Sequence, residues 1–144
     1  IFKLLEETEK LLSLTIMVQK EVAERMVAKP SGDYGLLSVM LAFYGEAKIT
    51  RIVKRNMFQP EPNVDSAVVT LEIQKKFDVD KKKFYNFVKT AFSMRRKTLL
   101  NNLSTIYEKE KLKRVFCEEF LKRRAETLTI EEFVEAYKKI NQHK

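Results

Sequence analysis

Cysteine and histidine are almost absent from this sequence of 144 residues, which contains one of each and no tryptophan. A lone cysteine cannot form an internal disulfide. One cysteine and one histidine cannot supply the four ligands of a structural zinc site, so we expect no metal. The scarcity of cysteine is typical of intracellular proteins, and we expect a cytoplasmic location.

Long apolar runs and glycine-rich turns are also missing. No run approaches the roughly 20 residues of a membrane span, and the first residues do not resemble a signal peptide. The three glycines are isolated from one another. The sequence therefore lacks the glycine-rich turn that follows the first strand in doubly wound nucleotide-binding sheets. We expect neither a membrane partner nor a cofactor bound to this polypeptide.

Positive charge is present in excess and is unevenly distributed. Of the net charge of +8, residues 1–76 carry +1 and residues 77–144 carry +7. A small, strongly basic segment favours a polyanionic partner, and RNA is the obvious candidate. A solvated lysine-rich surface is the alternative, and composition alone does not separate the two.

The first half of the chain alternates between predicted strands and helices. Strands are predicted over residues 12–18, 48–53 and 67–73, and helices at the start of the chain, from residue 19 and over residues 36–44. The first strand is rich in apolar residues, so we expect it to be buried. We therefore predict an α/β fold in residues 1–76, the C-terminal half of a doubly wound Rossmann-like sheet that ends in a hairpin.

The second half, residues 77–144, has helical periodicity throughout. Asp80 is a predicted N-cap, and Thr129 with Glu132 three residues later forms a predicted capping box. Between these two starts, helices are predicted over residues 98–107, with Ile106 facing inward, and over residues 109–121. We predict that residues 77–144 form a small all-helical domain.

The densest irregular segment is Phe58–Ala67, which contains two of the three prolines. Each proline fixes its own φ and disfavours a helical conformation in the residue before it. Phe58 therefore stands at the head of a stiff, extended loop that holds its ring at little entropic cost. The alternative is a proline-stiffened connection with Phe58 tucked into the core.

Four stretches together resemble the KsgA family of rRNA adenine N6,N6-dimethyltransferases. In chain order they are VQKEVAER (18–25), YGLLSV (34–39), FQPEPNVDSA (58–67) and AFSMRRKTLLNNL (91–103). Four matches in the family's order are far more specific than any one of them. The resemblance implies dimethylation of N6 of two adjacent adenines near the 3′ end of small-subunit rRNA, in a pre-30S-type particle during ribosome biogenesis. S-adenosylmethionine would be the methyl donor of the intact enzyme.

The resemblance also implies roles for individual residues. Phe58 would stack on the extruded target adenine, whose amine is a weak nucleophile and depends on close placement. Pro60 and Pro62 would fix the loop, and Asp65 and Ser66 would hold its exit by hydrogen bonds to backbone amides. Contacts with RNA are assigned to cationic and amide side chains of the basic half: Arg95, Arg96, Lys97, Asn101, Asn102, Lys122, Arg123 and Arg124.

For Arg95 and Arg96, stabilisation of a helix C-terminus is the alternative role. The family's glycine-rich turn and its Asn-Leu-Pro-Tyr motif do not occur in this sequence. We therefore expect a C-terminal fragment that lacks the cofactor site and is inactive alone. Two other functions stay open. One is the related large-subunit rRNA methylation that confers macrolide resistance, in enzymes that often carry Asn where Asp65 stands. The other is a non-catalytic nucleic-acid-binding module, such as the mitochondrial transcription factors derived from the family.

Overall fold

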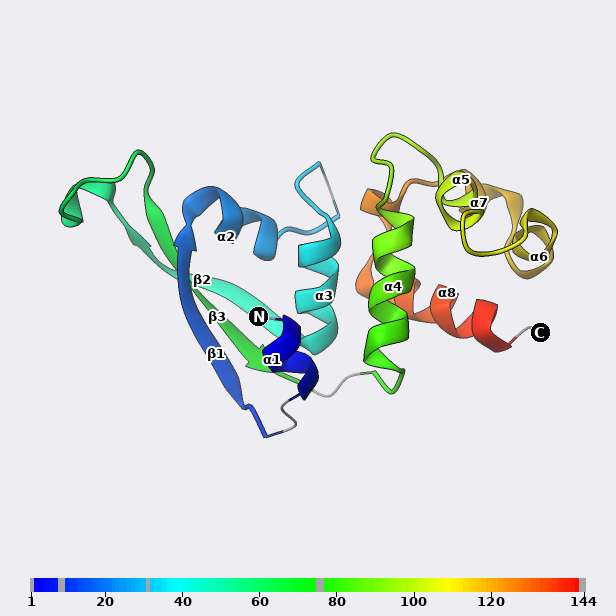
Figure 1. Cartoon of the computed structure of the whole chain (residues 1–144), viewed down its shortest axis with the longest axis horizontal. Helices are drawn as coiled ribbons and strands as arrows, with labels where there is room; N and C mark the ends of the chain where they lie inside the picture. The colour runs from blue at the N-terminus through cyan, green and yellow to red at the C-terminus, as the bar shows by residue number, and fades with distance from the viewer. Residues whose placement is uncertain (1, 8–9, 31, 75–76, 143–144) are drawn as a thin grey trace.

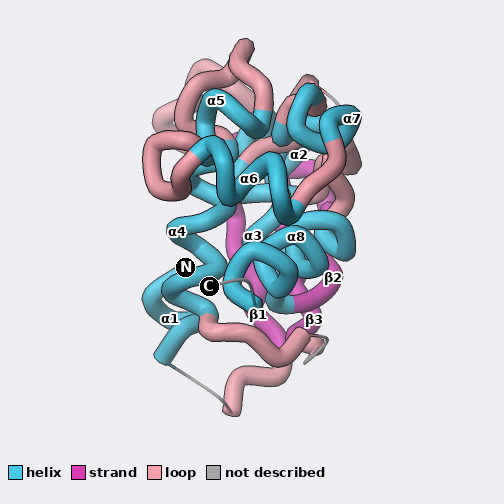
Figure 2. Tube along the Cα trace, turned by 90° about the vertical axis from the view of Figure 1, so that its right-hand side faces the viewer, coloured by secondary structure: helices cyan, strands magenta, loops and turns pink. Residues whose placement is uncertain are grey.

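The computed structural model describes residues 2–7, 10–30, 32–74 and 77–142. The elements are α1 (Phe2–Glu7), β1 (Ser13–Gln19), α2 (Lys20–Met26), α3 (Leu36–Tyr44), β2 (Gly45–Val53), β3 (Ser66–Ile73), α4 (Lys81–Ala91), α5 (Leu99–Leu103), α6 (Lys109–Val115), α7 (Glu118–Lys122) and α8 (Ile130–Gln142). A twisted sheet stands at one end of the molecule, and α4 to α8 gather at the other (Figure 1). Seen from the helical end, α5, α6 and α7 lie above α8 (Figure 2).

The sheet of the described residues has the strand order β1-β3-β2, with β3 antiparallel to both neighbours. The predicted α/β fold with a final hairpin, here β2 and β3, is therefore confirmed. At one end of the sheet the first residue of β3, Ser66, lies opposite Gln19 of β1 and Val53 of β2. All three strands thus meet at the end that carries the loop between β2 and β3.

Two details of the sheet differ from the prediction. Strand β2 begins at Gly45, directly after α3 and three residues before the predicted start. A Cβ at Gly45 would lie 1.8 Å from the carbonyl oxygen of Glu72, so only glycine fits where the chain passes β3 this closely. The expectation of a buried first strand is wrong. Strand β1 alternates between exposed and half-buried residues, because successive side chains point to opposite faces of the sheet, and it has a neighbour on one side only in the described part of the chain.

One hydrophobic core continues from the sheet helices into the helical part. Phe43 of α3 stacks on Phe84 of α4, with ring centroids 4.7 Å apart. Phe84 in turn meets the edge of Tyr137 of α8 at 5.6 Å. These three buried rings tie the two ends of the molecule together. The predicted domain boundary adjoins Lys75 and Lys76, which lie outside the described residues.

Two helix starts agree with the sequence prediction. The Asp80 carboxylate accepts a hydrogen bond from the Lys83 amide at 3.0 Å and caps α4. At the start of α8 the Glu132 amide donates to the Thr129 hydroxyl, and the Thr129 amide donates to the Glu132 carboxylate, both at 3.2 Å. The predicted capping box is therefore confirmed, because each side chain satisfies a backbone amide that the helix leaves unpaired.

The helices between α4 and α8 are shorter than predicted. The helix predicted over residues 98–107 is α5, which ends at Leu103, and Ile106 is 51% exposed rather than turned inward. After Leu103 the amides of Ile106 and Tyr107 both donate to the Leu103 carbonyl, so the chain closes the helix with a tight turn.

Extended backbone at Phe116 and Cys117 divides the helix predicted over residues 109–121 into α6 and α7. Phe116, at the break, packs against Phe120 of α7, with ring centroids 4.8 Å apart. Short helices joined by turns replace two longer ones in this part. None of the helices in the described ranges combines the length and apolar character needed to cross a lipid bilayer.

Candidate nucleic-acid interface

The connection between β2 and β3, residues 54–65, projects beyond the end of the sheet (Figure 1). We call it the diproline arm. A 3₁₀ turn at Arg55–Met57 opens it, and Phe58 follows with extended backbone. Phe58 is half-buried and does not belong to the hydrophobic core of the described residues. This position disagrees with the core-filling alternative and leaves the ring available at the arm. Pro60, which follows a cis peptide bond, is exposed, and Pro62 is half-buried.

Asp65 fastens the base of the diproline arm. Its Oδ1 accepts a hydrogen bond from the Arg55 amide at 2.8 Å, and its Oδ2 lies 3.7 Å from the Lys54 ammonium. The hydrogen bond from Arg55 is the main cause that holds the pKa of Asp65 below its ordinary value, with the Lys54 and Lys20 charges adding to it. The backbone carbonyl of Asp65 also accepts from the Lys20 amide at 2.9 Å. The entry and exit of the arm are thus joined through one residue.

A shallow cavity of about 380 Å³ lies beside this fastening point. It is bordered by the start of α2 and by the arm, including Lys20, Arg55, Asn63 and Asp65. Arg55 also pairs with Glu61 at 3.3 Å and so ties the two sides of the arm together. The arm therefore has a fixed shape and a polar cavity at its base.

Arg95, Arg96 and Lys97 are exposed in the turn between α4 and α5. Arg95 Nη2 donates to the carbonyl oxygen of Gly32 at 2.9 Å, so this side chain links the turn to the loop before α3. Arg96 and Lys97 extend the same exposed turn. Of the three cations, Arg95 therefore holds the turn to the loop before α3, and Arg96 and Lys97 are exposed.

The two predicted basic clusters, residues 95–97 and 122–124, are neighbours in space although they are far apart in the sequence. The Leu99 amide, just after the first cluster, donates to the Arg123 carbonyl of the second at 2.8 Å. Lys122 and Arg124 are exposed, and Lys122 pairs with Glu118 at 3.0 Å. No pattern in the sequence indicated this proximity, which brings two turns with exposed cations close together.

Two residues assigned to RNA are occupied within the protein, which corrects those assignments. Asn102 is 2% exposed, and its Nδ2 donates to the carbonyls of Ala91 at 2.8 Å and Met94 at 3.1 Å. Both amide hydrogens are therefore used to hold the turn after α4. Asn101, its neighbour, is exposed and keeps its predicted role as a proposal.

Arg123 is the second correction. Its guanidinium forms a two-pronged ion pair with the Glu132 carboxylate and donates to the Thr127 carbonyl at 2.7 Å. The hydrogen bond from Arg123 is the largest cause that lowers the pKa of Glu132. This pair anchors the start of α8, so the fork of Arg123 is not directed at a phosphate.

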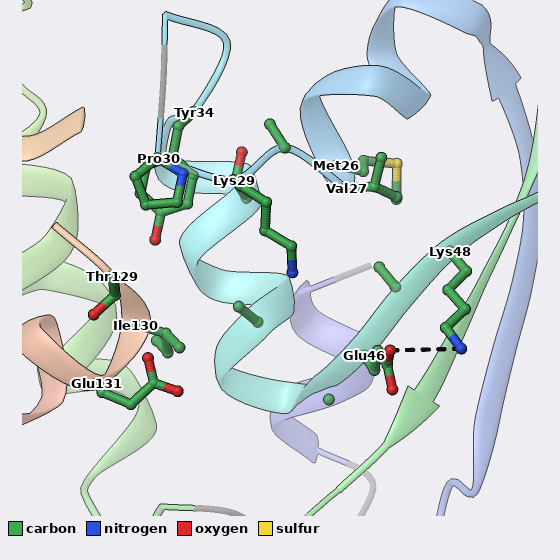
Figure 3. Close-up of a pocket in the computed structure, with 15 residues that line it drawn as sticks. Met26, Val27, Lys29, Pro30, Tyr34, Glu46, Lys48, Thr129, Ile130 and Glu131 are labelled. Carbon is green, nitrogen blue, oxygen red and sulfur yellow. Dashed lines mark ion pairs between the residues drawn. The ribbon is translucent and has the colours of Figure 1, made fainter. Parts of the chain in front are cut away.

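A larger cleft of about 590 Å³ lies between α3, β2 and the start of α8 (Figure 3). Lys48 pairs with Glu46 there at 3.5 Å, and Lys29 and Glu131 come from opposite sides. Burial, together with the charges of Glu131 and Glu132, raises the pKa of Tyr34 on its wall. Two lysines and two glutamates line this cleft, so its lining has no excess of positive charge and does not resemble a polyanion site.

In the described ranges, no group of three or more His, Cys, Asp or Glu side chains is placed so that it could hold a metal ion. The glycines do not form a nucleotide-binding turn either. Gly45 packs against β3, and Gly32 receives the hydrogen bond from Arg95. Each of these two glycines thus has a structural role in the described chain, and the exposed cations suit contacts with RNA phosphates.

Comparison with known proteins agrees with the resemblance seen in the sequence. The family model described as ribosomal RNA adenine dimethylase matches residues 1–142. Ribosomal RNA small subunit methyltransferase A of Bacillus licheniformis is 46% identical over 144 residues, covering 92% of this chain and 49% of that protein. The protein of the same name from Clostridium acetobutylicum is 46% identical over 140 residues, covering 92% of this chain and 51% of that protein. The chain spans about half the length of the curated relatives it matches.

Solved structures show the same fold. A dimethyladenosine transferase from Plasmodium falciparum matches with a TM-score of 0.85 and 22% identity, over 99% of this chain and 62% of the other. The 23S rRNA methyltransferase ErmE matches with a TM-score of 0.66 and 19% identity, over 98% of this chain and 59% of the other. With the family match over residues 1–142, these findings show that the chain belongs to the ribosomal RNA adenine dimethylase family.

Proposed function

We propose that this chain forms part of an rRNA adenine N6,N6-dimethyltransferase that acts on small-subunit rRNA during ribosome biogenesis in the cytoplasm. The observation that carries the proposal is the 46% identity to proteins named ribosomal RNA small subunit methyltransferase A. The same names favour the small subunit over the large-subunit alternative. S-adenosylmethionine would supply the methyl group when bound elsewhere in the intact enzyme.

The diproline arm would present the target adenine. The amine on C6 of adenine is a weak nucleophile because its lone pair is delocalised into the ring, so transfer depends on placement. An extruded base needs a flat partner to replace the stacking that it loses. Phe58 offers such a ring on an arm that Asp65 and Arg55 hold in shape. Pro60, Pro62 and Ser66 complete the proposed substrate loop.

Residues 77–144 would bind the surrounding RNA. Arg96, Lys97 and Arg124 are exposed cations on neighbouring turns, and Lys122 and Asn101 lie close to them in the sequence. Contacts of this kind follow phosphates and position the substrate without reading its sequence. Arg95 would act mainly by holding its turn against the loop before α3.

The test compares Phe58→Ala with Met57→Ala in a protein that contains this chain. Met57 is the neighbouring apolar residue and is 72% exposed, so it is a matched control. Methyl transfer from labelled S-adenosylmethionine to unmethylated small-subunit particles should fall at least about fivefold in Phe58→Ala, from the loss of one stacking contact. Met57→Ala should keep its activity, and RNA affinity should change little in both.

Unchanged turnover in Phe58→Ala would remove the ring from the site. Binding of small-subunit RNA without any methyl transfer by the unmodified protein would instead favour the non-catalytic binding module. Methylation of large-subunit RNA alone would favour the other alternative.

A further inference from the structure

A separate cavity of about 470 Å³ lies among the short helices α5, α6 and α7. Its wall is apolar where Leu100, Phe116 and Leu121 contribute. Phe116 and Leu121 are buried and Leu100 is half-buried, so the wall is part of the packed structure. The volume lies within the roughly 300–1,000 Å³ typical of ligand pockets. We call it the three-helix pocket.

Two lysines contribute to the lining of the three-helix pocket. Lys113 of α6 and Lys122 of α7 line it, and both are exposed. The acidic lining residue, Glu118, is already paired with Lys122 at 3.0 Å. Thr98, which also lines the pocket, directly follows Lys97 of the first basic cluster. The pocket therefore opens within the proposed RNA surface.

An apolar wall lined in part by exposed lysines matches the chemistry of one nucleotide. The flat faces of a base prefer apolar contacts, and its phosphate prefers lysine. A base inside a duplex cannot enter such a pocket, whereas proteins commonly bind bases that are splayed out from loops and bulges. We propose that the three-helix pocket accepts a single unpaired RNA nucleotide, with its base against Leu100 and its phosphate near Lys113. This inference rests on the proposed RNA binding by residues 77–144.

The test uses two RNA hairpins that differ in one unpaired 2-aminopurine nucleotide. The chain should bind the bulged hairpin more tightly than the fully paired one, and the fluorescence of the 2-aminopurine should change on binding. Leu100→Gln, which changes a half-buried residue of the wall, should reduce this preference by roughly fivefold, from weakened base contacts. Its urea unfolding midpoint shows whether the fold is kept.

Lys113→Gln and Lys109→Gln provide a matched pair on α6. Both remove one positive charge from an exposed residue, but only Lys113 lines the pocket. Lys113→Gln should weaken binding of the bulged hairpin by roughly threefold more than Lys109→Gln, from loss of a phosphate contact.

Equal affinity of the unmodified chain for the two hairpins would overturn the inference while leaving RNA binding intact. Equal effects of the two lysine changes would also overturn it. Failure to bind either hairpin would contradict both this inference and the proposed RNA-binding role.

Discussion

Asn101 and Asn102 are adjacent in the sequence but have opposite surroundings. Asn101 is exposed, whereas Asn102 is buried and donates to two backbone carbonyls at the end of α4. Sequence alone assigned both to RNA, because an Asn-Asn pair carries no mark of which side chain faces inward. The buried amide acts on the shape of the basic turn and not on the substrate.

Asn102→Ala should therefore destabilise the protein by about 1–3 kcal/mol, since it leaves buried carbonyls without donors. Asn101→Ala should change stability by less than about 0.5 kcal/mol, as expected for a surface position. Urea unfolding of both variants measures the difference. Equal stability of the two would mean that the Asn102 hydrogen bonds contribute nothing.

At the scale of elements, the start of α8 depends on Arg123. This residue pairs with Glu132 and also bonds to Thr127, so it joins the turn before α8 to its first turn. The pKa of Glu132 is lowered from its ordinary value of 4.5 in the folded protein. A carboxylate whose pKa is lower in the folded protein stabilises the fold at pH values above its pKa in the unfolded chain. This stabilisation is lost as the pH falls through its pKa in the folded protein.

Arg123→Ala should consequently be less stable than the unmodified protein at about pH 7, and the difference should shrink at about pH 3. The hydrogen bonds to Thr127 do not titrate in this range, so part of the difference should persist. Arg124→Ala is the control and should match the unmodified protein at both pH values. A stability difference that does not depend on pH would show that the ion pair with Glu132 is not the cause.

Patterns in the sequence predicted the elements whose signals are local. The capping box at Thr129 and the end of α3 at Gly45 each depend on residues within one turn. The break between α6 and α7, at Phe116 and Cys117, has no glycine or proline, so no local signal in the sequence marks it. Likewise, the partner of Arg123 lies nine residues away across a turn, which periodicity does not reveal.

At the scale of the whole molecule, the exposed cations of the two basic clusters should act together on RNA. A triple change at Arg96, Lys97 and Arg124 to Gln should reduce the slope of log affinity against log salt by about 2–3, from loss of three phosphate contacts. Titrations between about 50 and 200 mM salt measure this slope.

A control variant removes the same charge from the first half of the chain, by changing the exposed residues Lys10, Lys29 and Lys48 to Gln. Its slope should stay close to that of the unmodified protein. Equal slopes in the two triple variants would mean that net charge, and not the position of the clusters, determines binding.

The diproline arm and the helices α5 to α7 stand at opposite ends of the molecule (Figure 1). The shared aromatic core of Phe43, Phe84 and Tyr137 keeps those ends in a fixed relation. Under the proposed function, efficient substrates should be RNAs whose tertiary folding brings the target adenines and a distant strand to these two ends, so that architecture selects the substrate before any base is recognised.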